Sequence, residues 1–266
     1  LQEKNKKTII LGSERAGKSA ICRIIFYAKF NKGYIPVLMS ADKLSGTTPH
    51  EIERSILQCA SQQYKDLNQD CFKLIQQEYK IIILSDFHLA KYKTREKVKI
   101  LSHLHNKYSN VFITMDDHMQ YEEHISRNND GQSISAMYEV YSILPFGNKL
   151  RNSVIQKWIL QNQNEDVEYF SKIDKLTKVL NIIIRHNYVP SYPFYLYTAL
   201  SLYDAAHPNM LAESSYGYYY DALLTGALKR INMRTEEIDL RMNYLTNLAF
   251  HIYNLQKPNI TNAQFE

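Results

Sequence analysis

The stretch that decides the fold is Gly12-Ser13-Glu14-Arg15-Ala16-Gly17-Lys18-Ser19. It follows a short apolar run at residues 8–12 and precedes apolar residues at helical spacing, so we expect the order strand, loop, helix. Two glycines let the backbone turn tightly and approach a ligand without an intervening Cβ atom. The amide groups at the start of such a helix form an anion site, which the helix dipole strengthens. The stretch therefore predicts a phosphate-binding loop, or P-loop.

Each part of this loop has an expected role toward a nucleoside triphosphate. Lys18 brings a positive charge to the β- and γ-phosphates, and the Ser19 hydroxyl is a candidate Mg²⁺ ligand. The expected nucleotide-binding residues are Gly12, Ser13, Glu14, Arg15, Ala16, Gly17, Lys18, Ser19 and Ala20. Arg15 is a candidate for contact with phosphate or with a neighbouring subunit. A chance match in a glycine-containing turn is the alternative, and the flanking strand and helix argue against it.

An acidic residue is expected at the end of a strand that neighbours the P-loop strand. Residues 81–86 read Ile-Ile-Ile-Leu-Ser-Asp, four apolar residues and then an acid. Asp86 is predicted to hold Mg²⁺ or to orient the attacking water, and it completes the catalytic pair with Lys18. Ser85 stands where efficient hydrolases carry another acid. Either Asp86 serves the metal without a base, or Asp86 is the base and Ser85 lies on the metal side; both predict a weak, slow ATPase. A strand that simply ends in a polar turn is the alternative.

A further strand, at residues 111–115, ends near the same site. Thr114 is a neutral candidate for sensing the γ-phosphate. Asp116 and Asp117 would repel phosphate unless they face a cation, so a role at the loop surface is expected for them. For His88 and His118 a structural role is expected, and we assign no metal to either.

The rest of the chain places these motifs in an α/β fold. Further strands are expected at residues 34–40 and 137–144, and helices after Thr48 and at residues 97–108. Thr48, Pro49 and Glu51 form a capping-box pattern. Strands that alternate with helices predict a mainly parallel five-stranded sheet covered on both faces, the P-loop NTPase architecture.

After Gly147 only helical periods remain, so an all-helical domain is expected to follow. The expected domains are a P-loop domain at residues 1–147, a helical lid at 148–232 and a further domain at 233–266. Tyr216, Tyr218, Tyr219 and Tyr220 invite comparison with base stacking, but their spacing favours a packing face.

Composition narrows the functional classes. The chain has 266 residues, of which 45% are hydrophobic, with a net charge of +5 and three cysteines. The basic residues are dispersed, so nucleic-acid binding is not expected. Few, unpaired cysteines and the lack of a signal or membrane-spanning pattern predict a cytoplasmic protein without membrane contact. Because the sequence begins at Leu1, we expect a piece of a longer protein.

The order of these features resembles the STAND class of P-loop ATPases, relatives of the NACHT and NB-ARC switch proteins. The resemblance rests on residues 12–19, residues 81–88 and a helical domain with a proline break at residues 188–193. It implies that Pro190 or Pro193 packs near the adenine. It also implies that residues 233–266 begin a winged-helix-like domain that is cut short. The chain departs from the pattern in its missing second acid, and no arginine follows the fourth strand.

The resemblance also implies a function: a nucleotide switch, closed and monomeric with ADP and oligomeric with ATP and Mg²⁺. Effector and sensor domains of the same longer chain would be its partners, and an unknown trigger, such as a phage protein, would activate it. Bacterial signalling and anti-phage defence are the settings typical of such chains. Two alternatives remain open: an AAA-type DNA-associated ATPase, and a non-catalytic scaffold stabilised by nucleotide.

Overall fold

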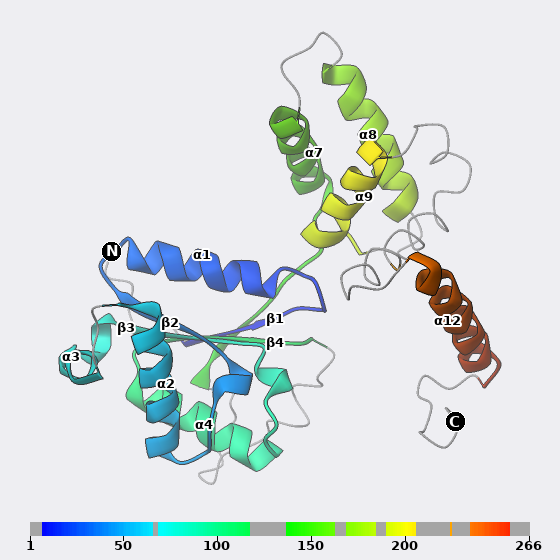
Figure 1. Ribbon diagram of the computed structural model, residues 1–266. Helices are drawn as coiled ribbons and strands as arrows, with labels where there is room; N and C mark the ends of the chain where they lie inside the picture. Colours follow the sequence, from blue (N-terminus) through cyan, green and yellow to red (C-terminus); the bar gives the residue numbers. More distant parts are fainter. Residues whose placement is uncertain are drawn as a thin grey trace. The chain divides into compact units, whose positions relative to one another are not determined.

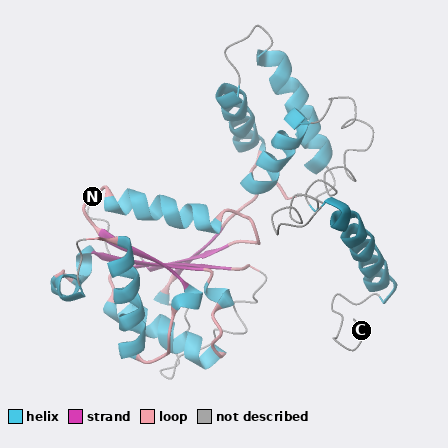
Figure 2. Cartoon of the chain, viewed as in Figure 1, coloured by secondary structure: helices cyan, strands magenta, loops and turns pink. Residues whose placement is uncertain are grey.

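The computed structural model describes residues 7–65, 69–117, 137–162, 169–184, 190–205, 224 and 235–255. The chain divides into two compact units. Residues 1–146 form the first unit together with the short segment Tyr192–Phe194, and the remaining residues from Gly147 onward form the second. In the described residues the strands belong to the first unit, and the second unit contains helices (Figure 2).

The first unit is built on a five-stranded parallel sheet in the order β2-β3-β4-β1-β5. The strands are β1 (Lys7–Leu11), β2 (Ile35–Ser40), β3 (Lys80–Ser85), β4 (Asn110–Met115) and β5 (Glu139–Ser142). All five predicted strands are confirmed, as is the parallel sheet. The strand with the predicted acidic partner is not adjacent to β1, because β4 lies between β1 and β3.

The central strands are apolar because both faces of the sheet are covered. Ile81 and Ile83 of β3 pack with Cys22 beneath α1 (Lys18–Phe30). Ile82 and Leu84 belong to the larger core on the opposite face, with α2 (Pro49–Gln63) and α4 (Thr94–Lys107). Figure 1 shows α1 on one side of the sheet and these two helices on the other. Successive side chains of β3 point to opposite faces of the sheet, so this one strand contributes to the core on each face.

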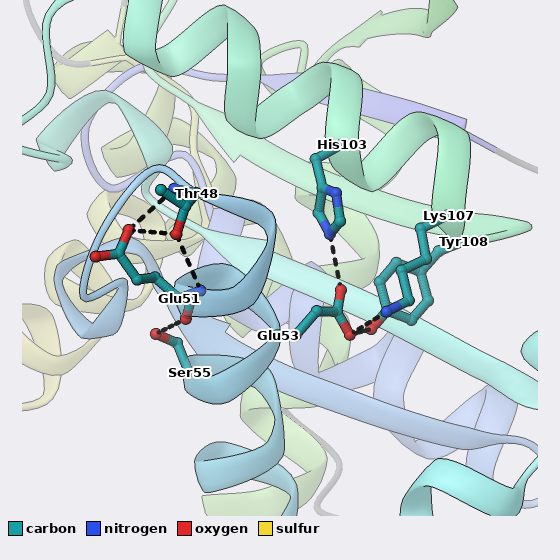
Figure 3. Close-up of polar contacts among 7 residues, drawn as sticks. All are labelled: Thr48, Glu51, Glu53, Ser55, His103, Lys107 and Tyr108. Carbon is teal, nitrogen blue, oxygen red and sulfur yellow. Dashed lines mark hydrogen bonds and ion pairs between the residues drawn. The ribbon is translucent and has the colours of Figure 1, made fainter.

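Short elements complete the first unit. They are α3 (Gln69–Leu74) and the 3-10 turns η1 (Ala41–Lys43), η2 (Gln77–Tyr79) and η3 (Phe87–Leu89). The predicted capping box at the start of α2 is confirmed: Glu51 N donates to Thr48 Oγ1 at 3.4 Å, and Thr48 N donates to Glu51 Oε2 at 3.0 Å (Figure 3).

A charged cluster joins α2 to the end of α4. The Glu53 carboxylate accepts hydrogen bonds from His103 Nε2 at 2.8 Å and from the Tyr108 hydroxyl at 2.8 Å, and it pairs with Lys107 Nζ at 2.7 Å (Figure 3). Burial by itself would raise the pKa of Glu53, but the hydrogen bonds from these three residues outweigh it and leave the pKa lowered. The carboxylate is therefore held in its charged form.

Strand β2 is an edge of the sheet, and side chains from the end of α2 occupy its outer side. Gln63 Oε1 accepts from Leu38 N at 3.1 Å, and Gln63 Nε2 donates to Leu38 O. The next residue, Tyr64, donates its hydroxyl to Pro36 O at 2.7 Å. A side-chain amide therefore bonds this backbone as a neighbouring strand would.

The second unit contains α7 (Asn148–Asn162), α8 (Tyr169–Ile184), α12 (Thr235–Leu255) and most of α9 (Pro193–Ala205). The helices expected around Val154 and Leu180 are confirmed, and both residues are buried. The packing face expected for Tyr216, Tyr218, Tyr219 and Tyr220 lies outside the described residues. Among the described helices none combines the length and apolar character needed to cross a membrane.

Candidate functional site

The predicted loop connects β1 to α1, and its backbone shows why glycine stands at two positions. Gly17 has φ 105°, a left-handed conformation that disfavours side chains, and α1 begins at the next residue. At Gly12 the reason is space: a Cβ atom would lie 3.0 Å from Ile143 Cδ1 and 3.3 Å from the Ala16 Cβ atom. The Gly12 amide donates to Met115 O at 3.1 Å, which continues the pairing of β1 with β4.

Lys18 lies inside the loop. Its Nζ atom donates to Gly12 O at 2.6 Å and to Ser13 O at 3.0 Å, and the residue is only 8% exposed. Two carbonyl dipoles thus solvate the ammonium group in place of water. A phosphate that enters the loop would replace these contacts and receive a charge that is already positioned there.

Other loop side chains contact residues that are far away in the sequence. Ser13 Oγ donates to Asp117 Oδ2 at 2.7 Å and lies 3.3 Å from the Tyr192 hydroxyl. The Arg15 guanidinium lies over the Phe194 ring, 4.6 Å from its centroid. Tyr192 and Phe194 belong to the short segment that groups with the first unit. No sequence pattern singles out either aromatic residue, and the family resemblance implies a role only for the prolines beside them.

Asp86 comes directly after β3, as predicted, and adopts a left-handed conformation with φ 53°. Its backbone N–H donates to Thr114 Oγ1 at 3.0 Å. Thr114 is 1% exposed, at the end of the adjacent strand β4. This hydrogen bond fixes the residue that carries the predicted catalytic carboxylate. The sensing of γ-phosphate by Thr114 stays a prediction.

Cys22, on the first turns of α1, lies beside these two residues. Burial raises the pKa of its thiol to about 11; the Asp86 carboxylate contributes to the rise, and a hydrogen bond with Thr114 opposes it. The thiol therefore stays protonated at neutral pH. Cys22 is 1% exposed and packs in the core beneath the site.

His88 follows Asp86 in the turn η3. Burial lowers its pKa, the charge of Lys18 lowers it further, and the carboxylates of Asp116 and Asp86 act in the opposite direction. Its Nδ1 atom is buried and has no hydrogen-bond partner within the described residues. The structure thus places a neutral histidine within electrostatic range of the loop lysine, whereas His118 lies outside the described residues.

The remaining predicted residues divide into two groups. Glu14, Ser19 and Ala20 are exposed in the loop and at the start of α1. Pro193 begins α9 between the two aromatic residues that contact the loop, and Pro190 groups with the second unit. Contact of either proline with a base stays a prediction.

The chemistry of this site suits a magnesium-bound polyphosphate. The Ser19 hydroxyl and the Asp86 carboxylate offer hard oxygen ligands, and Mg²⁺ in such sites takes one or two protein ligands together with phosphate oxygens and water. No group of three or more histidine, cysteine or acidic side chains suited to a metal occurs in the part of the chain that the structure describes.

The strand order and the loop together define the class: the first unit has the α/β fold of the P-loop NTPases. No family model matches the sequence, and no curated protein matches it. Solved structures that resemble it include AMPPCP-bound DnaA from Aquifex aeolicus, with a TM-score of 0.38 and 16% identity, covering 67% of this chain and 56% of that chain.

Two further structures show comparable similarity. The replication initiator DnaA bound to AMPPCP and single-stranded DNA has a TM-score of 0.36 and 15% identity, covering 94% of this chain and 89% of that chain. A DNA replication initiation factor has a TM-score of 0.35 and 15% identity, covering 88% and 76%. Similarity at this level carries no argument about activity, and the assignment of the class rests on the sheet and the loop.

Proposed function

We propose that this chain binds ATP or ADP with Mg²⁺ through residues 12–20. The observation that carries the proposal is the position of Lys18, whose charge is buried among the loop carbonyls at the start of α1. A lysine that begins the helix after a glycine-containing loop, with its ammonium group held by the loop carbonyls, is suited to the β- and γ-phosphates. Asp86 supplies a carboxylate at the end of β3 for the metal or for water.

We further propose that hydrolysis is weak. Ser85 precedes Asp86 where a second acid would allow one carboxylate to serve the metal and the other to orient water. With a single carboxylate, these two tasks fall on one residue. Slow turnover prolongs the triphosphate-bound state, as a molecular switch requires.

The switch proposal extends to the whole protein. In it, ADP holds a resting monomer. A trigger that a sensor domain of the longer chain detects leads to exchange for ATP, which drives assembly of copies and activates an effector domain in prokaryotic defence signalling. Support within the described residues comes from the contacts of Ser13 and Arg15 with Tyr192 and Phe194, which link the loop to the start of α9. A bound phosphate that moves the loop would thus act on these aromatic residues.

The decisive experiment identifies nucleotide released from denatured, purified protein by chromatography. Lys18→Ala is compared with Lys99→Ala, which removes the same charge from an exposed position of α4. We expect ADP or ATP from the parent and from Lys99→Ala, and none from Lys18→Ala. Added MgATP should raise the melting temperature of the same two proteins only.

The outcomes separate the parts of the proposal. ADP in the parent supports the resting switch, and a larger particle in size-exclusion chromatography with MgATP supports assembly. Absence of released nucleotide, together with an unchanged melting temperature, would leave a scaffold whose loop binds nothing and would overturn the proposal.

A further inference from the structure

A second candidate site lies in the second unit, between α7 and α8. A cavity of about 230 Å³ opens there, with α7 and α8 as its walls. Its lining residues are Asn148, Arg151, Asn152, Ile155, Thr177, Leu180 and Asn181. Ile155 and Leu180 are 1% and 2% exposed and form an apolar floor. Polar groups around an apolar floor are the usual make-up of a small-molecule site, and this volume suits a compact ligand.

The charge of this cavity comes from one residue. Arg151 is the only ionisable side chain among the lining residues that the structure describes. The side-chain contact that the structure gives it is a hydrogen bond from Nη2 to Asn148 Oδ1. A guanidinium carries five N–H donors, so most of them remain for a ligand. Within the described residues no carboxylate pairs with Arg151, and the first turn of α7 contains no acid.

We propose that this cavity binds a small monocarboxylate with a short apolar tail. The carboxylate would take a two-point contact with the Arg151 guanidinium, whose planar donors match its geometry. The amides of Asn152 and Asn181 and the Thr177 hydroxyl offer further hydrogen bonds at the rim. The tail would cover Ile155 and Leu180.

The lining also excludes other ligand classes. Its described residues include no acid, so an ammonium group would be desolvated without a partner among them, which disfavours cations and free amino acids. The described lining offers one cation, Arg151, so it would leave the second charge of a phosphate dianion uncompensated. These two constraints leave the monoanion as the best match. The proposal does not depend on nucleotide binding, because the cavity and the P-loop belong to different units.

The chain carries its own reporter for this site. Trp158 is the only tryptophan of the protein and lies on α7, seven residues after Arg151. Seven residues are about two helical turns, so both residues lie on a similar side of α7. Its ring contacts the Tyr197 ring, with centroids 6.0 Å apart. Tryptophan fluorescence should therefore respond to a ligand that orders the wall of the cavity.

The test titrates the full chain with butyrate and follows Trp158 fluorescence, with butylammonium as the cation of equal length and inorganic phosphate as the competing oxyanion. The Lys18→Ala background removes binding of phosphate at the P-loop. We expect a saturable change with butyrate alone. Arg151→Gln should weaken the affinity at least about tenfold, whereas Lys157→Gln, an exposed position of the same helix outside the cavity, should leave it unchanged.

Three outcomes would overturn the proposal. They are a response to butyrate that does not saturate, an equal response to butylammonium, and saturation with phosphate instead of butyrate. Thr177→Val in the opposite wall is a second variant, expected to weaken butyrate binding as well if Arg151→Gln does not fold. Binding that survives in the folded variant of either residue contradicts the assigned site.

Discussion

At the scale of single residues, the position of Asp86 depends on a hydroxyl group from a neighbouring strand. A left-handed conformation is uncommon for a residue with a side chain and persists where its surroundings hold it. The hydrogen bond from Asp86 N to Thr114 Oγ1 supplies that hold. Because Thr114 is almost fully buried, water cannot replace the hydroxyl if it is lost.

We predict that Thr114→Val lowers the free energy of unfolding by about 1–3 kcal/mol, since the partly buried Asp86 amide would lose its acceptor. ATP hydrolysis should fall more than nucleotide binding, because the loop itself is untouched. Thr114→Ser keeps the hydroxyl and serves as the control. Urea unfolding and single-turnover hydrolysis measure both effects; a valine variant that hydrolyses ATP like the parent would show that Asp86 needs no such hold.

Local patterns explain which site residues could be foreseen. Lys18 and Asp86 stand beside short apolar runs that identify their strands, so six to eight consecutive residues sufficed to place each near the site. Tyr192 could not be found in this way, because it is 179 residues away from Ser13 and its helix start resembles many others. Long-range contacts of this kind carry no local sequence signal.

At the scale of elements, the Glu53 cluster ties α2 to α4 through three donors on one carboxylate. The same environment changes the pKa of Tyr108. Burial raises this pKa, and the negative charge of Glu53 raises it further. The Tyr108 hydroxyl therefore keeps its proton and remains a hydrogen-bond donor at all moderate pH values. Near neutral pH the Glu53 carboxylate is therefore charged and the Tyr108 hydroxyl keeps its proton.

We predict that Glu53→Gln destabilises the protein by about 1–3 kcal/mol near neutral pH, because hydrogen bonds to a charged acceptor are stronger than those to an amide. The pKa of Glu53 is lowered in the folded protein, so the added stability is present above its ordinary pKa of 4.5 and is lost as the pH falls through the lowered value. Urea midpoints at several pH values measure this, with Glu78→Gln at an exposed position as the control. An equal loss at every pH would point to packing instead of charge.

The elements themselves were largely readable from the sequence. Four consecutive apolar residues at 81–84 predict a strand that is buried on both faces, and β3 is such a strand. The capping box predicts where α2 begins. The order of the strands was not readable, since no residue pattern states that β4 separates β1 from β3. The short helix α3 also went unpredicted, because six residues give too few turns for a periodic pattern.

At the scale of the whole molecule, the segment Tyr192–Phe194 groups with the sheet although its neighbours on both sides group with the helices. The Tyr192 hydroxyl contacts the Ser13 hydroxyl, and the Phe194 ring lies under the Arg15 guanidinium. Under the proposed function this segment stabilises the occupied loop.

We predict that Phe194→Ala speeds the release of a fluorescent ADP analogue about two- to fivefold, the loss expected for an exposed cation–π contact of roughly 0.5–1 kcal/mol. Phe170→Ala, on the exposed side of α8, should leave the rate unchanged. Stopped-flow displacement with excess ATP measures both. A release rate identical to that of the parent would show that Phe194 does not help to retain the nucleotide.

The contact of Gln63 with Leu38 has a consequence for the protein in concentrated solution. An open strand edge is a template on which other chains can add, which leads to aggregates. On β2 the side-chain amide of Gln63 takes up the backbone N–H and C=O of Leu38, which another strand would otherwise bond. Because Gln63 belongs to the helix α2, its own backbone does not extend the sheet. This one side chain therefore protects the β2 edge against aggregation. We expect Gln63→Ala to leave the fold intact but to aggregate more readily at high protein concentration.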